Sequence, residues 1–262
     1  MYKISFFVNF ASEIANDNSL MMTGNSYEMR VEPQDVDFTL RAKASAMCNN
    51  ILNIAGTDAQ RNGFGVDALM RNNCSWVLSR LAVEFDSLPE QFTSFSIRTW
   101  VNYDGRLLSS RNFVLTDEKG AVFGRAVSQW AMINFETRRP TDLNELAESY
   151  TSILSDEPSP CERPRKLFPA EPQQTAVHKI VYSDIDFNRH VNTLRYMDMM
   201  TDMLPIETFA NPRPVRLDFH FVKESRYGQT LTVGLEQRGD TSLFEIKSDD
   251  GAVVCRASFE WR

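Results

Sequence analysis

A short acidic segment occurs twice in this chain and constrains its fold more than any other feature. The two copies are Asp35-Val-Asp-Phe38 and Asp184-Ile-Asp-Phe187. Each copy follows a strand-like stretch, precedes a helical pattern, and is then followed by four strand-like runs rich in Val, Phe, Trp and Ile. An internal repeat of this kind predicts two units built on one plan.

The pattern places the same elements in both copies. The first copy predicts a strand, a helix and four strands, at 24–32, 40–55, 74–85, 93–103, 107–116 and 122–135. The second predicts the same order, at 176–182, 189–204, 214–223, 230–237, 242–247 and 253–261. A strand, a long apolar helix and an antiparallel meander predict an α+β fold with a sheet wrapped around a central helix. Two such units form a double hotdog.

These elements divide the chain into four expected parts. They are an N-terminal extension over 1–22, a first hotdog over 23–140, a linker over 141–172 and a second hotdog over 173–262. Met21 and Met22 directly precede the first predicted strand, so residues 1–20 are interpreted either as a dispensable extension or as the result of a wrongly assigned start. Its apolar run over 4–10 is too short to span a membrane.

Composition excludes several classes of partner. The formal net charge of -7 argues against broad binding to nucleic acid or to anionic lipid, because both need a basic face. The cysteines have no metal-type spacing and no secretory signal precedes them, so we expect a cytoplasmic protein with reduced thiols, without disulfide or zinc. They are Cys48, Cys74, Cys161 and Cys255.

Aligning the two copies isolates candidate catalytic residues. Asp186 has a counterpart in the first copy, whereas Asn188 and His190 do not: the aligned residues are Asp37, Thr39 and Arg41. One interpretation of these residues is helix capping, because Asp and Asn are favoured N-cap residues. For Asp186, both interpretations, a helix cap and a catalytic residue, stay open.

Thioester hydrolysis gives these residue types a chemical reason. Negative charge develops on the carbonyl oxygen, and donors at a helix N-terminus stabilise it. Asn188 and the ring or backbone N–H of His190 are candidate donors, and Asp186, or a Glu from another strand, is a candidate to orient His190 or take a proton from water. His178 and His220 are weaker candidates, because strand alternation turns His220 away from the Phe-rich side.

Several longer motifs, in order, resemble the acyl-acyl carrier protein (acyl-ACP) thioesterases of plants and bacteria. In the second half they are Phe221-Val-Lys-Glu-Ser225, Tyr196 and residues 182–192. In the first half they are Gly63-Phe-Gly65, Trp76-Val-Leu-Ser-Arg80, Arg98-Thr-Trp100 and the run over 128–139. The likeness extends from about Tyr27 to Trp261.

The resemblance implies a tandem hotdog fold that releases free fatty acid from acyl-ACP without a metal or organic cofactor. Carried over by position, the family's catalytic residues are Asp186, Asn188, His190 and Glu224. In plant members a Cys follows this Glu, but here the residue is Ser225. A thiolate mechanism therefore has no cysteine at the family position, and direct attack by water is favoured.

The resemblance also implies that the first copy mainly holds the acyl chain. Acidic ACP is the expected partner, and the candidate docking charges are Arg138, Arg139, Arg163, Arg165 and Lys166. For the last three, a solvated linker is the favoured interpretation. A homodimer is a further expectation. The alternative functions are an acyl-CoA thioesterase, a hotdog hydratase or dehydratase, and a non-catalytic acyl-binding module.

Overall fold

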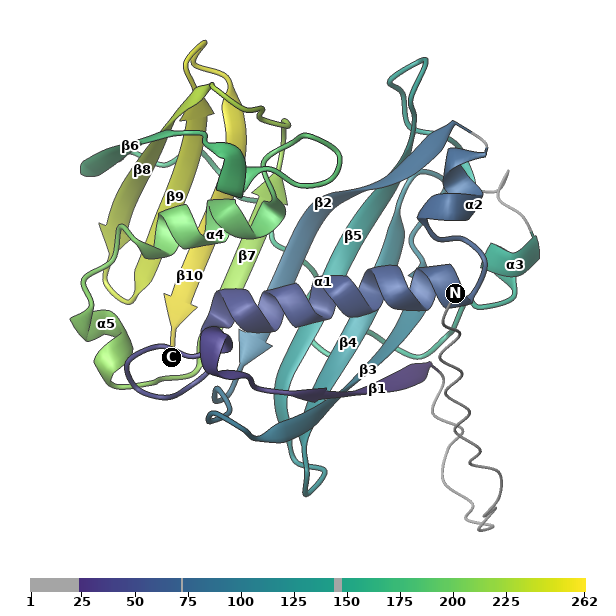
Figure 1. The fold of residues 1–262 in the computed structure, drawn as a ribbon, viewed down its shortest axis with the longest axis horizontal. Coiled ribbons are helices and arrows are strands. Elements are labelled where there is room, and N and C mark those ends of the chain that lie inside the picture. Colours follow the sequence, from purple (N-terminus) through teal and green to yellow (C-terminus); the bar gives the residue numbers. More distant parts are fainter. Residues whose placement is uncertain (1–23, 72, 144–147) are drawn as a thin grey trace, which may run out of the picture.

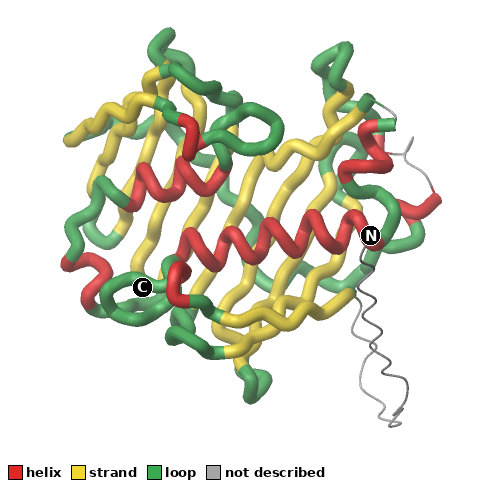
Figure 2. Tube along the Cα trace, in the orientation of Figure 1, coloured by secondary structure: helices red, strands yellow, loops and turns green. Residues whose placement is uncertain are grey.

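One large antiparallel sheet carries the helices on one of its faces (Figure 1). The computed structural model describes residues 24–71, 73–143 and 148–262. The N-terminal extension expected over 1–22 lies outside the described residues. Figure 2 shows α1 (Ala44–Arg61) and α4 (Thr193–Thr201) lying one after the other across the strands. An antiparallel sheet with few helices is the α+β arrangement expected from the sequence, and it is consistent with a hotdog-like fold.

The strands and helices of both halves occur in nearly the same order. Those of the first half are β1 (Asn25–Arg30), η1 (Pro33–Asp35), α1, α2 (Val66–Met70), β2 (Cys74–Phe85), β3 (Ser94–Tyr103), β4 (Ser109–Asp117), β5 (Val122–Asn134) and α3 (Glu148–Thr151). Those of the second half are β6 (Gln174–Lys179), η3 (Tyr182–Asp184), α4, α5 (Glu207–Ala210), β7 (Val215–Phe221), β8 (Thr230–Arg238), β9 (Thr241–Ser248) and β10 (Val253–Trp261).

The sheet repeats its own strand order about its centre. The order is β1-β3-β4-β5-β2 in the first half and β7-β10-β9-β8-β6 in the second, which is the same arrangement read from the other edge. The halves join where β2 and β7 pair antiparallel, with Arg80 opposite His220 and Phe85 opposite Val215. The internal repeat inferred from the sequence is therefore a repeat of topology.

The apolar stripe of each long helix faces the sheet. In α1 the buried residues include Met47, Ile51 and Ala55, at the helical spacing seen in the sequence. In α4 they include Met197 and Met200, which belong to the same core cluster. No helix in the described part of the chain is both long and apolar enough to cross a membrane.

Both helices begin later than the sequence predicted. The helix expected over 40–55 occupies 44–61, and the one expected over 189–204 occupies 193–201. Leu40 and Arg189 have φ values of 59° and 64°, which no right-handed helix accommodates. The residues before each helix form a β-bridged loop instead, so the apolar periodicity was extended too far toward the N-terminus.

The part of the expected linker over 162–172 lies on the sheet face opposite the helices. Its carbonyl groups at Glu162 and Arg163 accept hydrogen bonds from Arg216, which is fully buried and also contacts Asp218 and Glu84. Arg216 and Asp218 alternate along β7 with core residues, so they lie on the other face. Farther along, a Cβ on Gly234 would lie 2.6 Å from the Pro172 ring. This part of the linker thus packs against the sheet through its backbone and Pro172, while Arg163, Arg165 and Lys166 stay exposed to solvent.

Candidate active site

The second copy of the acidic segment folds into a closed loop in front of α4. Ile185 and Val191 form an isolated antiparallel bridge, and the Asp186 N–H donates to the His190 carbonyl at 2.8 Å. The cap of α4 is Asn192, whose side chain accepts the Leu194 N–H at 2.9 Å. The capping interpretation of Asp186 was therefore wrong for this helix.

The Asp186 side chain organises the loop. Its Oδ1 accepts the backbone N–H groups of Asn188 at 2.8 Å and of His190 at 3.0 Å. An Asp in this arrangement satisfies local backbone donors in a turn. The backbone N–H of His190 is consequently already bonded, which corrects the expectation that it serves a developing oxyanion. The His190 ring and the Asn188 amide remain as donors.

His190 faces Glu224 across the loop. The imidazole Nε2 lies 3.2 Å from Glu224 Oε2, and the side chains are 20% and 36% exposed, so both are reachable from solvent. Glu224 follows the end of β7, and the next residue fixes its position because the Val191 N–H donates to the Ser225 carbonyl at 2.8 Å. The structure thus brings together two residues that lie far apart in the sequence.

The first half supplies a cation to this pair. Arg138, in the turn after β5, has its Nη2 3.1 Å from Glu224 Oε2. Its φ of 57° belongs to a tight turn in which its N–H donates to the Asn134 carbonyl. Sequence reasoning treated Arg138 only as a docking charge. The sole available signal was its place in the family-like run over 128–139, which does not show that this turn approaches the second half.

Asn188 stands apart from the pair. Its side chain is exposed, and its amide makes no hydrogen bond within the described residues. It is therefore free to donate to a ligand.

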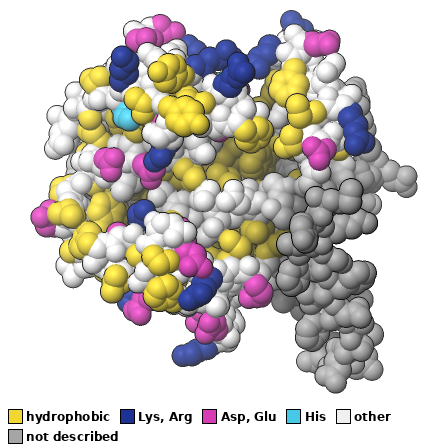
Figure 3. Space-filling view, viewed as in Figure 1, with side chains coloured by type: hydrophobic (Ala, Val, Ile, Leu, Met, Phe, Trp, Pro, Cys, Tyr) yellow, Lys and Arg dark blue, Asp and Glu magenta, His cyan; other side chains and the backbone are white. Residues whose placement is uncertain are grey.

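Figure 3 shows the helix-bearing face hollowed near its middle, with recessed hydrophobic side chains between the two halves.

The hydroxyl and thiol groups behind Glu224 are poorly placed to act as nucleophiles. Ser225 is 1% exposed, and its Oγ has no hydrogen-bond partner in the described part of the chain. Beside it, burial raises the pKa of Tyr196 to about 12. Cys255 is also buried, and burial raises the pKa of its thiol. A buried thiol with a raised pKa provides little thiolate.

The other two histidines have structural surroundings. His178 Nε2 lies 2.8 Å from Asp184 Oδ2. Burial opposes ionisation of Asp184, but this contact and the Val181 N–H hold the pKa of the carboxyl below its usual range. His220 lies between Arg80 and Arg256 on the face away from the helices, and burial and then these arginines lower its pKa. For His220, the structure shows the orientation away from the Phe-rich side that strand alternation predicted.

The first-copy loop, residues 36–42, repeats the backbone of the His190 loop, residues 185–191, but not its side chains. The Asp37 N–H donates to the Arg41 carbonyl at 3.0 Å, and Val36 bridges Ala42. Arg41 occupies the position of His190 and pairs with Glu90 at 2.8 Å. An arginine stays protonated in proteins and cannot act as a base, so only the second half carries the His–Glu pair.

The five expected docking charges differ in how far other side chains already engage them. Arg163 pairs with Asp104 at 2.6 Å, and Arg165 pairs with Glu260 at 2.5 Å. Lys166 lies over the Phe168 ring. Within the described chain, Arg139 has no side-chain ion-pair partner, which leaves it as the least engaged of the five.

Metal ligands do not gather around the site. No group of three His, Cys, Asp or Glu side chains is placed to hold a metal ion among the residues described.

Known proteins resemble this chain over most of its length. Two family models match it, the acyl-ACP thioesterase N-terminal domain over residues 22–150 and the C-terminal domain over residues 169–262. Oleoyl-acyl carrier protein thioesterase 2 of Arabidopsis thaliana, a chloroplastic protein, is 28% identical over 214 residues, covering 72% of this chain and 56% of the relative. The chain spans about half the length of the first curated relatives it matches.

Solved structures share the fold. The crystal structure of an acyl-ACP thioesterase from Bacteroides thetaiotaomicron is 37% identical with a TM-score of 0.83, covering 91% of this chain and 97% of that one. The 12:0-ACP thioesterase from Umbellularia californica is 19% identical with a TM-score of 0.81, covering 93% and 99%, and shows likeness of fold alone. Because the two family models together match well over half of its residues, the chain belongs to the acyl-ACP thioesterase family.

Proposed function

We propose that this protein hydrolyses the thioester bond of fatty acyl-ACP, releasing free fatty acid and terminating chain elongation. The observation that carries the proposal is the His190–Glu224 pair at 3.2 Å, exposed at a loop that a single Asp186 side chain holds in shape. A relative that is 37% identical over nearly its whole length bears the name acyl-ACP thioesterase, which supports the same activity here.

Water is the nucleophile in the proposed reaction. Glu224, in contact with His190, takes a proton from water, whose oxygen forms a bond to the thioester carbon. Negative charge then develops on the carbonyl oxygen, and the Asn188 amide with the His190 ring donates to it. Collapse of the intermediate breaks the carbon–sulfur bond, and the proton passes to the departing thiolate. The products are a carboxylic acid and a free carrier thiol.

The division of labour between the halves belongs to the same proposal. We assign a tandem hotdog, with the acyl chain held by residues 23–140, catalysis in residues 173–262 and a linker between them. The repeated strand order and the α1 helix across the first half support this assignment. A cytoplasmic location and a homodimer remain predictions. ACP is the proposed partner, and Arg139 is the docking charge that the ion-pair pattern favours.

Thiol release from acyl-ACP and from acyl-CoA, measured on the same acyl chain, tests the proposal. We expect faster release from acyl-ACP, and a loss of roughly 10²- to 10⁴-fold in kcat for His190→Ala and for Glu224→Gln. His220→Ala, on the opposite face of the sheet, is the matched control and should keep its rate. Equal or better rates on acyl-CoA would overturn the carrier-protein assignment. An enoyl product with an intact thioester would indicate a dehydratase.

Complete absence of thiol release, together with acyl binding, would instead favour a non-catalytic binding module. Unchanged rates in both His190→Ala and Glu224→Gln would refute the site.

A further inference from the structure

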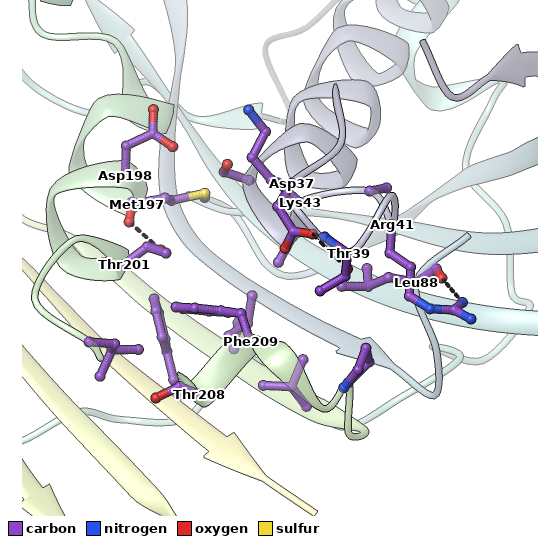
Figure 4. A pocket seen from close by; sticks show the side chains of 18 of the residues that line it. Asp37, Thr39, Arg41, Lys43, Leu88, Met197, Asp198, Thr201, Thr208 and Phe209 are labelled. Atoms are coloured by element: carbon purple, nitrogen blue, oxygen red, sulfur yellow. Dashed lines mark hydrogen bonds between the residues drawn. The ribbon is translucent and has the colours of Figure 1, made fainter. Parts of the chain in front are cut away.

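A cavity lies against the first-copy loop, and neither His190 nor Glu224 lines it. Its volume is about 610 Å³, and its walls come from residues 37–45, α4, α5, β7 and β10. Figure 4 shows Met197 and Thr201 of α4 on one side, with Thr39 and Lys43 of the loop opposite them and Phe209 of α5 below. The cavity therefore lies between a loop of the first half and the apolar face of the second.

Internal symmetry explains this position. The first-copy loop has the backbone bonding of the catalytic loop, including the bridge between Val36 and Ala42 and the left-handed residue Leu40. In the second half Glu224, which contacts His190 of the catalytic loop, meets Arg138 of the first half, and the first-copy loop in turn lines one cavity together with strands of the second half. The cavity thus occupies the place of a second site with the halves exchanged.

The floor of the cavity is apolar and continuous. It is formed by Val215, Leu217 and Phe219 of β7 with Phe259 and Trp261 of β10. The volume falls within the roughly 300–1,000 Å³ range of small-molecule sites, which are mainly lined by hydrophobic and aromatic side chains. A flexible hydrocarbon chain suits such a floor, because it buries apolar surface without leaving polar groups unpaired.

Three charged side chains on the rim of the cavity have no ion-pair partner among the described residues: Lys43, Asp37 and Asp202. Four basic and three acidic side chains line the cavity, the acidic ones being Asp37, Asp198 and Asp202. Arg195 pairs with Asp198, Arg213 with Asp240 and Arg41 with Glu90. Lys43, the remaining cation, is exposed and has no ion-pair partner within the described residues. It is therefore the cation available to a ligand.

We propose that this cavity is a second, non-hydrolytic site for a long-chain fatty acid, with the hydrocarbon chain on the β7–β10 floor and the carboxylate at Lys43. The site lacks the groups for hydrolysis, because Arg41 stands where the catalytic loop has His190 and Thr39 where it has Asn188. Binding here does not depend on the proposed hydrolysis at His190, so the two proposals can fail separately.

Photolabelling locates the bound chain. The probe is a sixteen-carbon fatty acid with a diazirine near its terminal carbon, and the labelled peptides of the full-length protein are mapped by mass spectrometry. We expect label in the segments over 193–221 and 253–262. Label confined to the first half, or its absence from these segments in the unmodified protein, would overturn the proposal.

Two variants test the geometry further. Thr208→Trp places an indole in the cavity and should remove most of the label from both segments, whereas Thr232→Trp, on an exposed part of β8, should not. Lys43→Met should weaken the apparent affinity about fivefold, as expected for an exposed ion pair, and Lys179→Met serves as its control. Thermal unfolding checks that each variant is folded. Equal labelling in Thr208→Trp and Thr232→Trp would contradict the assignment, whatever the rate of thioester hydrolysis.

Discussion

The imidazole Nε2 of His190 lies 3.2 Å from Oε2 of Glu224, and the same carboxylate oxygen is 3.1 Å from the Arg138 guanidinium. Three segments therefore converge on one oxygen: the loop before α4, the end of β7 and the turn after β5. A carboxylate in contact with both an imidazole and a guanidinium is held in place, which is what a base that activates water requires.

If His190 and Glu224 act as one unit, their substitutions will not be additive. We expect His190→Ala, Glu224→Gln and the double variant to lose kcat by similar factors, since removal of either residue already disables the pair. Single-turnover thiol release from acyl-ACP measures this. Losses that multiply in the double variant would mean that the two residues act independently.

The sequence predicted more of the fold than of the site. The repeated Asp-x-Asp-Phe segment and the strand periodicity were enough to predict two copies of one plan, because alternation and turn residues are local signals. The start of each helix was wrong, since the conformations of Leu40 and Arg189 depend on a bridge that closes over several residues. The approach of Arg138 to Glu224 was missed for a similar reason, because it depends on how the halves pair through β2 and β7.

Variants of Asp186 and Asp37 distinguish an effect on loop stability from an effect on catalysis. Asp186 accepts two backbone N–H groups, and Asp37 accepts the N–H and the hydroxyl of Thr39. We expect Asp186→Ala and Asp37→Ala each to lower the free energy of unfolding by about 1–2 kcal/mol. Only Asp186→Ala should also lower the rate of thiol release. Urea unfolding and the hydrolysis assay together decide this, and equal rate losses in both variants would indicate a purely structural role.

Variants of Arg138 and Arg139 distinguish a residue that contacts the site from a residue that docks ACP. Arg138 touches Glu224 in a half-exposed ion pair, so we expect Arg138→Met to lower kcat by up to about fivefold on acyl-ACP and on acyl-CoA alike. If Arg139 contacts acidic ACP, then Arg139→Met should raise KM for acyl-ACP only and become less damaging as salt increases. The comparison of both variants on both substrates provides its own control. A carrier-specific effect of Arg138→Met would move Arg138 to the docking surface.

Ser225 distinguishes attack by water from an acyl-enzyme route. Its Oγ is buried without a hydrogen-bond partner among the described residues, so Ser225→Ala removes an unsatisfied polar group. We expect kcat within about threefold of the native value and stability that is equal or slightly higher. Mass spectrometry of the quenched reaction should find no acylated protein. Two results together would contradict the water mechanism: loss of activity in Ser225→Ala, and an acyl group found on Ser225 of the native enzyme.

The buried pair of Asp58 and Arg111 gives the fold a pH dependence of known sign. Burial opposes the charge on Asp58, but the Arg111 guanidinium at 2.6 Å, with hydrogen bonds from Asn25 and Tyr27, holds the pKa of Asp58 below its usual range. A carboxyl whose pKa is lower in the folded state contributes stability above its unfolded pKa of about 3.9, and this contribution is lost as the pH falls through the folded pKa.

Arg111→Met leaves the Asp58 carboxylate buried without its cation, which should cost about 3–5 kcal/mol at pH 7. In this variant burial is no longer offset by Arg111, so the pKa of Asp58 rises and the carboxyl can become neutral in acid. We therefore expect the difference in free energy of unfolding between native protein and variant to shrink from pH 7 to pH 4. Urea unfolding at both values measures it, with Asp58→Asn/Arg111→Met as a control that lacks the titrating group. A difference that is the same at both pH values would show that Arg111 stabilises the core through packing alone.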